Sequence, residues 1–292
     1  MFKLKIITFI LRGFAKLPLP IIHHLGAFLG WCLGLFAPKF PKRIAQNLRM
    51  SMPSINDVEL NLLVKSNIKE SGKAVLETFA IWFRRLDELK PWFAQCTGWQ
   101  HVDAGFKAGR GIIFLTPHLG CFEITSLYYG QFQPITVLYR PPRQAWLMPF
   151  ISAGRARGGV TLAPANAQGV KQLLQALKRN EAIGILPDQA PLTGEGDWAP
   201  FFGRPAYTMS LASKLAQKTG AQVLMAYGER LSKGRGYHIH IRPIPAGGIA
   251  TPSLLNAQIE QTIQQCPAQY TWAYDRYKVR AESSHKLHSA DN

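Results

Sequence analysis

Gly111-Ile-Ile-Phe-Leu-Thr116, followed by Pro117-His-Leu-Gly-Cys-Phe-Glu123, is the segment most informative about the architecture. A short apolar run between Gly and Pro predicts a strand that is buried on both faces, as in a parallel sheet covered by helices. Ligands of such sheets bind beyond the carboxyl ends of the strands. Residues 117–123 therefore occupy the place where a functional site is expected.

Short β-branched runs alternate with helical segments along the rest of the chain. Strands are predicted at 135–139, 182–186, 222–227 and 237–244, and helices at 166–179, at 209–218 and from 253 to before Pro267. This alternation predicts an α/β fold, a single mixed sheet flanked by helices on both faces.

The composition limits the class of protein and its partners. The 292 residues include 34 Lys plus Arg and 17 Asp plus Glu, a net charge of +17, and 47% of them are apolar. These values exclude a disordered chain or a disulfide scaffold, and the four separated cysteines indicate reduced thiols. The positive charge predicts an anionic partner: nucleic acid, a phospholipid surface, or acidic carriers and phosphorylated substrates.

The N-terminal segment combines positive charge with apolar length. Eight Lys and Arg but no acidic residue precede Asp57, and they frame the apolar runs 4–11 and 21–37. As a helix the second run is about 26 Å long, close to the ~30 Å hydrocarbon core of a bilayer. We expect a membrane anchor over residues 1–45, spanning or interfacial, with a buried first helix of a soluble fold as the alternative. The positive-inside rule places the body in the cytoplasm.

The body is predicted to be one α/β domain over residues 46–282, followed by a flexible tail at 283–292. Ser54-Ile-Asn-Asp57 resembles a capping box, and apolar residues three and four apart after it predict a long helix that ends near Arg85.

His118 and Glu123 are the candidate catalytic pair. Five residues correspond to about 500° of a regular helix, so the two side chains meet only if His118 precedes the helix and Glu123 lies in its first turn. Such a pair makes a general base and the carboxylate that orients it. Taken alone, the spacing favours a structural histidine, because a His and a Glu five residues apart often occur by chance.

Four arginines and Asp188 are candidates for substrate binding. Arg140, Arg143, Arg155 and Arg157 flank the strand at 135–139 and a Gly-bounded loop, and guanidinium groups match phosphate oxygens. Solvated surface arginines are the alternative for each of them. Asp188 follows the strand at 182–186, where it holds an arginine, acts on substrate or forms a turn.

Several short blocks resemble, in order and over nearly the whole chain, the bacterial lipid A late acyltransferase family of the glycerolipid and lysophospholipid acyltransferase superfamily. Besides Thr116–Glu123 these blocks are Arg43-Ile-Ala-Gln-Asn-Leu48, Tyr139-Arg-Pro141, Gly154-Arg-Ala-Arg-Gly158, Leu186-Pro-Asp-Gln189, Phe201-Phe-Gly203 and Pro267-Ala-Gln-Tyr-Thr-Trp272. The superfamily block Phe-Pro-Glu-Gly is replaced here by Leu186-Pro-Asp-Gln189, which favours the lipid A branch and adds Gln189 to the substrate-binding candidates.

The resemblance implies a glycerolipid acyltransferase-like fold and an activity. A fatty acyl chain would pass from an acyl carrier protein thioester to a hydroxyl of a phosphorylated glycolipid of the Kdo-lipid A precursor type, in lipopolysaccharide biosynthesis. The reaction would occur on the cytoplasmic face of the inner membrane. His118 would be the general base, and no cofactor is implied.

An acyltransferase for a lysophospholipid or ornithine lipid, with acyl-CoA or the carrier protein as donor, is the alternative. A non-catalytic basic membrane-binding protein is a further one, and no nucleic-acid motif is found.

His238 and His240 alternate along a predicted strand and share one of its faces. With no Cys or carboxylate beside them in the sequence, the pattern favours a half-exposed strand over a metal site, so no metal is predicted.

Overall fold

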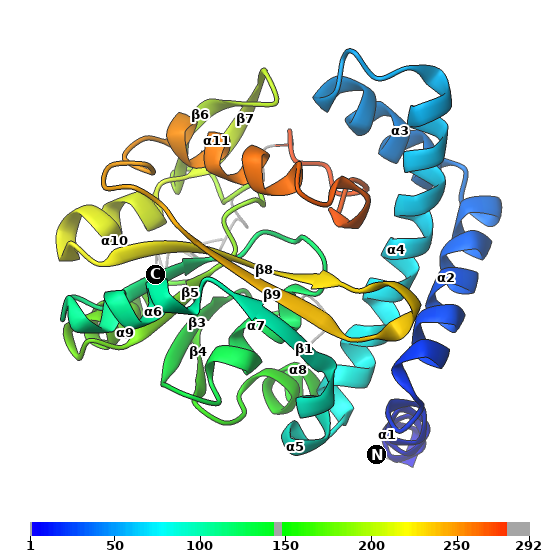
Figure 1. Cartoon of the computed structure of the whole chain (residues 1–292), viewed down its shortest axis with the longest axis horizontal. Coiled ribbons are helices and arrows are strands. Elements are labelled where there is room, and N and C mark those ends of the chain that lie inside the picture. Colours follow the sequence, from blue (N-terminus) through cyan, green and yellow to red (C-terminus); the bar gives the residue numbers. More distant parts are fainter. Residues whose placement is uncertain (1, 143–147, 279–292) are drawn as a thin grey trace, which may run out of the picture.

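The computed structural model describes residues 2–142 and 148–278 and builds a central sheet between two layers of helices (Figure 1). The helices of the N-terminal half are α1 Phe2–Ala15, α2 Leu19–Phe36, α3 Lys39–Ser51, α4 Asp57–Phe83, α5 Leu86–Leu89, α6 Trp99–Lys107 and α7 Phe122–Tyr129. Those of the C-terminal half are α8 Met148–Arg155, α9 Ala167–Lys178, α10 Leu211–Thr219 and α11 Pro252–Ile263.

The main sheet has seven strands in the order β1-β9-β8-β2-β5-β3-β4. Their bounds are β1 Phe93–Thr97, β2 Ile112–Leu115, β3 Ile135–Tyr139, β4 Val160–Pro164, β5 Ala182–Ile185, β8 Gln222–Arg230 and β9 Tyr237–Pro243. Neighbouring strands are parallel except β8 and β9, which are antiparallel. The predicted mixed α/β sheet is confirmed. A separate hairpin of β6 Gly196–Phe201 and β7 Arg204–Met209, together with β1 and β4, was not predicted.

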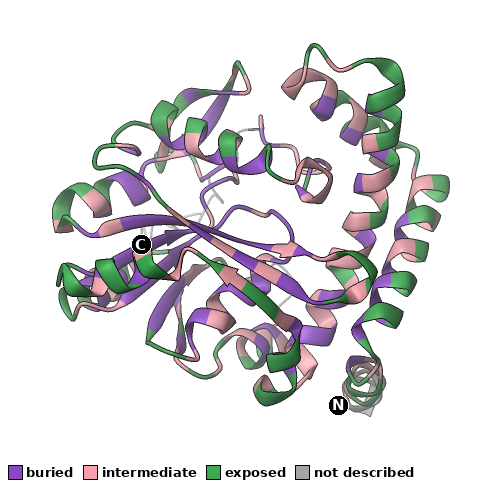
Figure 2. Cartoon of the chain, in the orientation of Figure 1, coloured by how far each residue is buried: buried purple, intermediate pink, exposed green. Residues whose placement is uncertain are grey.

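Two apolar clusters fill the space on either side of the sheet, because successive side chains of each strand point to opposite faces. Ile113, Leu115 and Ile185 belong to the cluster with α9, α10 and α11. Ile112 and Phe114 belong to the other, which includes residues of α6 and α7. Figure 2 shows that burial is most continuous in the central strands, such as β5 and β8, whereas the edge strand β1 is largely exposed.

Two helix caps show how far the predicted boundaries hold. Asn166 caps α9 as expected, with its side chain accepting from the backbone N–H of Gly169. The capping box predicted at Ser54–Asp57 is wrong, because the side chain of Asn56 caps α4 by accepting from the N–H of Glu59. The long helix itself is confirmed, since α4 ends at Phe83.

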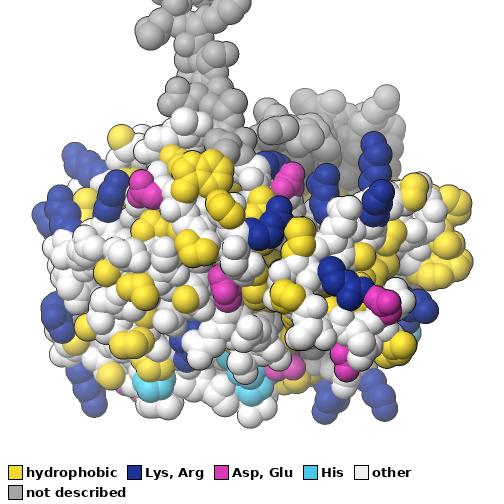
Figure 3. Space-filling model, turned by 90° about the horizontal axis from the view of Figure 1, so that it is seen from above, with side chains coloured by type: hydrophobic (Ala, Val, Ile, Leu, Met, Phe, Trp, Pro, Cys, Tyr) yellow, Lys and Arg dark blue, Asp and Glu magenta, His cyan; other side chains and the backbone are white. Residues whose placement is uncertain are grey.

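Helix α2 lies along α4 and keeps an apolar outer face. The two backbones approach so closely that a Cβ atom on Gly72 would come within 2.1 Å of the carbonyl oxygen of Gly26. By length and composition, α2 is the one helix of the described chain that is apolar enough to cross a membrane. Its exposed large side chains are Ile21, Leu25, Phe28, Trp31, Leu33, Leu35 and Phe36. In Figure 3, yellow side chains gather at the right-hand edge, on the side where α2 lies in Figure 1.

A buried polar cluster ties α2 and α4 to the sheet. Glu77 of α4 is 1% exposed and accepts hydrogen bonds from Arg230 of β8 and, at 2.8 Å, from the hydroxyl of Tyr237 of β9. The imidazole of His23, on α2, lies 3.1 Å from the same carboxylate. Burial alone would raise the pKa of Glu77, but Arg230 and His23 together lower it to about 2.

Glu77→Gln is expected to destabilise the protein near pH 7 by about 3 kcal/mol, as when one member of a buried ion pair is removed. Because the pKa is lowered from 4.5 to about 2 in the folded state, the stabilisation is present above pH 4.5 and is lost as the pH falls towards 2. Unfolding midpoints at pH 7 and pH 3 check this, with the exposed Glu59→Gln on the same helix as the control. An equal deficit at both pH values would contradict it.

Candidate active site

His118 and Asp188 lie side by side because the strands that precede them are paired in register. Leu115 of β2 pairs with Ile185 of β5, and each is followed, two residues on, by Pro117 or Pro187. The next residues are His118 and Asp188. Equal numbers of residues after two neighbouring parallel strands bring both side chains to the carboxyl edge of the sheet.

Asp188 uses both carboxylate oxygens on His118. One oxygen lies 2.8 Å from the ring Nδ1, and the other accepts the backbone N–H of His118 at 2.9 Å. Asp188 is 2% exposed. Its burial alone would raise the pKa, but the charge of His118 and the hydrogen bonds to it hold the pKa below its usual value. An ionised carboxylate has no proton to donate, so Nδ1 carries the hydrogen and Nε2 is the basic nitrogen.

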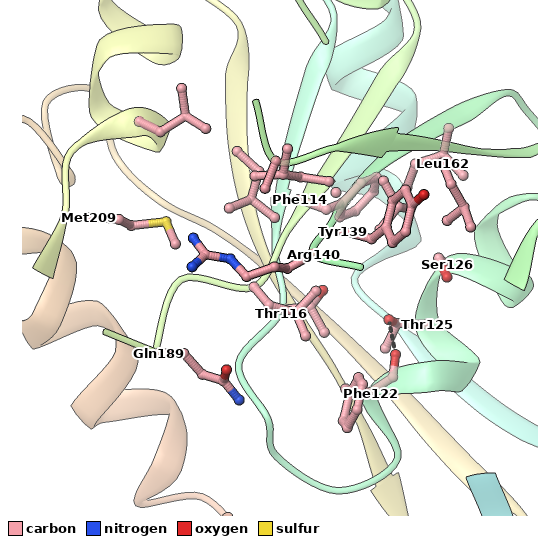
Figure 4. A pocket seen from close by; sticks show the side chains of 18 of the residues that line it. Phe114, Thr116, Phe122, Thr125, Ser126, Tyr139, Arg140, Leu162, Gln189 and Met209 are labelled. Atoms are coloured by element: carbon pink, nitrogen blue, oxygen red, sulfur yellow. Dashed lines mark hydrogen bonds between the residues drawn. The ribbon is translucent and has the colours of Figure 1, made fainter. Parts of the chain in front are cut away.

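The basic nitrogen of His118 faces Gln189. The Nε2 of the ring lies 3.1 Å from the side-chain nitrogen of Gln189, which follows Asp188 in the same turn. The ring also packs on Phe122, with 4.7 Å between the centroids. Figure 4 shows Gln189 and Phe122 on either side of the loop that carries the histidine.

The loop from His118 to Cys121 is fixed by its backbone. Gly120 has φ +59°, and a Cβ atom there would lie 2.0 Å from the carbonyl oxygen of Gly228, so only glycine fits. The N–H of Gly120 donates to the carbonyl of Gln269, and the N–H of Cys121 donates to that of Gly228. The carbonyl of His118 accepts from the hydroxyl and the N–H of Thr271.

The sequence analysis predicted that Glu123 orients the ring of His118. In the structure, the carboxylate of Asp188 contacts this ring instead. Glu123 lies in the first turn of α7, 5% exposed, and accepts hydrogen bonds from the guanidinium of Arg155 and, at 3.2 Å, from the indole N–H of Trp82. The first turn directs Glu123 towards α4 and α8, whereas the loop directs His118 towards β5. Asp188 therefore takes the place predicted for Glu123.

The predicted arginines separate into different environments. Arg155 lines the cavity described below, and its ion pair with Glu123 raises its pKa against the effect of burial. Arg157 donates to the backbone carbonyls of Ile81, Arg84 and Gly154, which fixes the end of α4. Arg140 lines the cavity and pairs with Glu195 at 3.2 Å. Arg143 lies outside the described residues.

A cavity of about 600 Å³ opens beside the histidine and is lined mainly by apolar side chains. This volume is in the usual range for small-molecule sites. Six consecutive strands of the sheet contribute to its wall through Ile239, Ala226, Phe114, Gly184, Val137 and Leu162. His118, Glu123, Arg140, Arg155 and Gln189 also line it, and Figure 4 shows Arg140 near Thr116 and Met209. The site thus joins a basic imidazole and cations to an apolar slot.

Residues 3–279 match the family model of the bacterial lipid A biosynthesis acyltransferases. The chain belongs to this family. Among its relatives are the lipid A biosynthesis lauroyltransferase of Escherichia coli, 26% identical over 91% of this chain and 88% of that protein, and the palmitoleoyltransferase of the same organism, 26% identical over 94% and 90%. A lipid A biosynthesis acyltransferase of Haemophilus influenzae is 25% identical over 93% and 88%. The protein is therefore an acyltransferase of lipid A biosynthesis.

The cavity brings together His118, Glu123, Arg140 and Arg155, which the sequence analysis selected, but the contact of Asp188 with His118 was not predicted. The signal was available in Thr116-Pro-His118 and Leu186-Pro-Asp188, where a proline stands at the same distance after two buried strands. To pair Asp188 with His118 from this signal, one must know that β2 and β5 are neighbours in the sheet, although β3 and β4 lie between them in the sequence.

Proposed function

We propose that this acyltransferase moves a fatty acyl chain from an acyl carrier protein thioester to a hydroxyl of a Kdo-lipid A precursor. The family and the names of the relatives support the lipid A pathway. The observation that carries the proposal is the His118–Asp188 pair at an apolar cavity. An imidazole base beside an alkyl-sized slot is what acyl transfer to a lipid hydroxyl needs.

His118 acts as general base and then as general acid. Its Nε2 takes the proton of the acceptor hydroxyl as the oxygen attacks the thioester carbonyl, and Asp188 stabilises the imidazolium that forms. When the carbon–sulfur bond breaks, the same proton passes to the leaving thiolate, so the thiol is released and His118 returns to its neutral form. Because Gln189 faces Nε2 in this structure, its amide makes way for the acceptor hydroxyl.

Glu123 and Arg155 act at the cavity wall. Their ion pair links α7 to α8, and the guanidinium also lies over the ring of Trp82, 5.6 Å from its centroid. We assign the acceptor phosphates or the phosphopantetheine phosphate of the donor to Arg140 and Arg155, which both line the cavity. Arg157 instead supports the end of α4 through its three carbonyl contacts.

The N-terminal helices provide the membrane contact in this proposal. The outer face of α2 and residues Phe9 and Ile10 of α1 expose large apolar side chains. The neighbouring residues Arg12, Lys16, Lys39, Lys42 and Arg43 are basic, and each such charge gains about 1 kcal/mol near an anionic leaflet. This arrangement supports residues 1–45 as the anchor on the cytoplasmic face of the inner membrane, with 46–282 as the catalytic body.

Mass spectrometry of purified reactions tests the function. The full-length protein is given lauroyl- or palmitoyl-carrier protein, or the matching acyl-CoA, with a Kdo-lipid A precursor or a lysophospholipid as acceptor. We expect one acyl mass to be added to the lipid A precursor from the carrier-protein donor. Transfer only to the lysophospholipid, or only from acyl-CoA, would contradict the proposed substrates. Lipid A from cells with and without the gene provides the matching cellular measurement.

We propose that Gly184 determines the length of acyl chain that the cavity accepts. It lies between Phe114 and Val137 in register, and its ideal Cβ would point to within 3.2 Å of a Val137 methyl group. Glycine in a strand interior often marks the close approach of a ligand.

Gly184→Val is expected to shift the preference towards shorter donors. Shortening the slot by two methylenes costs a long chain about 1.6 kcal/mol, or roughly 15-fold in the kcat/KM ratio of long to short donors. The ratio of palmitoyl to lauroyl transfer is the readout, because it does not depend on the fraction of folded enzyme. Gly184→Ala should give a smaller shift. Equal losses for both donors would show that Gly184 does not line the acyl slot.

A further inference from the structure

A cluster of two imidazoles and one carboxylate lies on the sheet away from the catalytic cavity. Residues opposite or alternate in the β8–β9 pair share a face, and Glu229 pairs directly with His238, while His240 follows two residues later. The sequence analysis rejected a metal here because no carboxylate stands near these histidines in the chain. The antiparallel pairing supplies one, which the linear spacing does not reveal.

The ligand atoms of these three residues converge. One oxygen or nitrogen from each of Glu229, His238 and His240 lies within 4.8 Å of the others. The carboxylate oxygen of Glu229 is 2.8 Å from Nε2 of His240. The hydroxyl of Thr97, on the other neighbouring strand β1, lies 3.2 Å from Nε2 of His238 and 3.5 Å from Nδ1 of His240.

The surroundings hold the histidines in place and leave access from solvent. The His240 ring stacks on Tyr227, with 4.6 Å between centroids and 10° between planes, and the two imidazoles are 3.8 Å apart. The side chains of His240 and Glu229 are 26% and 36% exposed. A metal ion can therefore enter the cluster without unfolding the sheet.

We propose that Glu229, His238 and His240 form a binding site for a divalent transition-metal ion such as Zn²⁺. Two imidazoles and one carboxylate are a ligand set that zinc accepts, with water in the fourth position. Zinc–ligand bonds of about 2.0–2.2 Å place tetrahedral ligand atoms about 3.4 Å apart. The 2.8 Å distance between the Glu229 oxygen and Nε2 of His240 must therefore lengthen slightly. Any pair of ligand atoms that is further apart, up to 4.8 Å, must shorten, and side-chain rotations can make both changes.

The site is independent of the proposed catalysis. Glu229 follows Gly228, whose carbonyl accepts the backbone N–H of Cys121 in the loop that carries His118, but the side chain of Glu229 lies on the face of β8 shared with Tyr227. A bound ion would join β8 to β9 through side chains that do not line the cavity. Binding and stability, rather than acyl transfer, are therefore the proper readouts.

Isothermal titration of the chelator-treated full-length protein with ZnCl₂ tests the proposal. We expect one ion per chain and a rise in the thermal unfolding midpoint, because a ligand that binds only the folded state stabilises it. Glu229→Gln and His240→Asn should each weaken zinc binding at least tenfold and abolish the thermal shift. His24→Asn is the matched control, since that exposed histidine bonds the carbonyl of Pro20 on α2, outside the cluster, and should leave binding unchanged.

Two outcomes would overturn the proposal. One is a wild-type protein that takes up no zinc under these conditions. The other is equal zinc binding by the wild type and the Glu229→Gln, His238→Asn, His240→Asn triple variant, which would place the ion elsewhere. The substituted side chains are partly exposed, and circular dichroism of each variant separates a lost ligand from a lost fold.

Discussion

His118→Ala is expected to lower acyl transfer by about 10²–10⁴-fold, the usual contribution of a positioned general base. The backbone N–H of residue 118 still donates to Asp188, so the buried carboxylate keeps one partner and the fold is retained. The measurement is the initial rate of acyl transfer per folded enzyme, with circular dichroism as the check on folding.

His118→Asn is the matched control for that experiment. Its amide can donate to Asp188 in place of the ring Nδ1–H but cannot accept the proton of the acceptor hydroxyl. Both variants should therefore be equally inactive if the basic nitrogen is what matters. Near-wild-type turnover by either purified variant would remove His118 from the mechanism.

Asp188→Asn is expected to be nearly as damaging, although it is isosteric. The same change behind a catalytic histidine costs on the order of 10⁴-fold in triad hydrolases, because the amide favours the wrong tautomer and no longer stabilises the imidazolium. Both carboxylate oxygens of Asp188 contact His118. Because Asp188 is buried, water cannot take over the stabilisation of the imidazolium when the negative charge is removed.

Nitrogen NMR of labelled histidine distinguishes this role from a merely structural one. We expect the Nδ1–H form of His118 in the wild type and its loss in Asp188→Asn. Glu123→Gln is the contrasting variant: it weakens the contacts to Arg155 and Trp82 but should leave the tautomer of His118 unchanged. A tautomer that changes in Glu123→Gln and not in Asp188→Asn would restore the pairing that the sequence analysis predicted.

Local patterns predicted those parts of the fold that depend on neighbouring residues. The strand at Ile135–Tyr139 and the helix after Asn166 have their expected bounds or differ by a residue. Strand β1 was missed because Phe93 begins a half-exposed edge strand, with the polar Gln95 and Thr97, inside a segment rich in aromatic residues. The hairpin of β6 and β7 contains Pro200 and Pro205, and prolines argue against strands in a sequence.

The site was predicted only in part, because its contacts join distant segments. His118 was identifiable from its place after a buried strand, but its partner Asp188 is 70 residues away and depends on the order of the strands. Arg157 resembled a phosphate ligand in the sequence, whereas its guanidinium binds carbonyls of α4. The carboxylate of Glu229 reached His240 only through an antiparallel register that no short motif reports.

The most direct test of the His118–Asp188 base is a double-mutant cycle on the rate of acyl transfer. Turnover per folded enzyme is measured for the wild type, His118→Ala, Asp188→Asn and the double variant with the same donor and acceptor. If Asp188 acts through His118, the double variant is no slower than His118→Ala alone, because residues that act as a unit are not additive. A double variant slowed by the product of the two single losses would show that the two residues act independently and would contradict the mechanism.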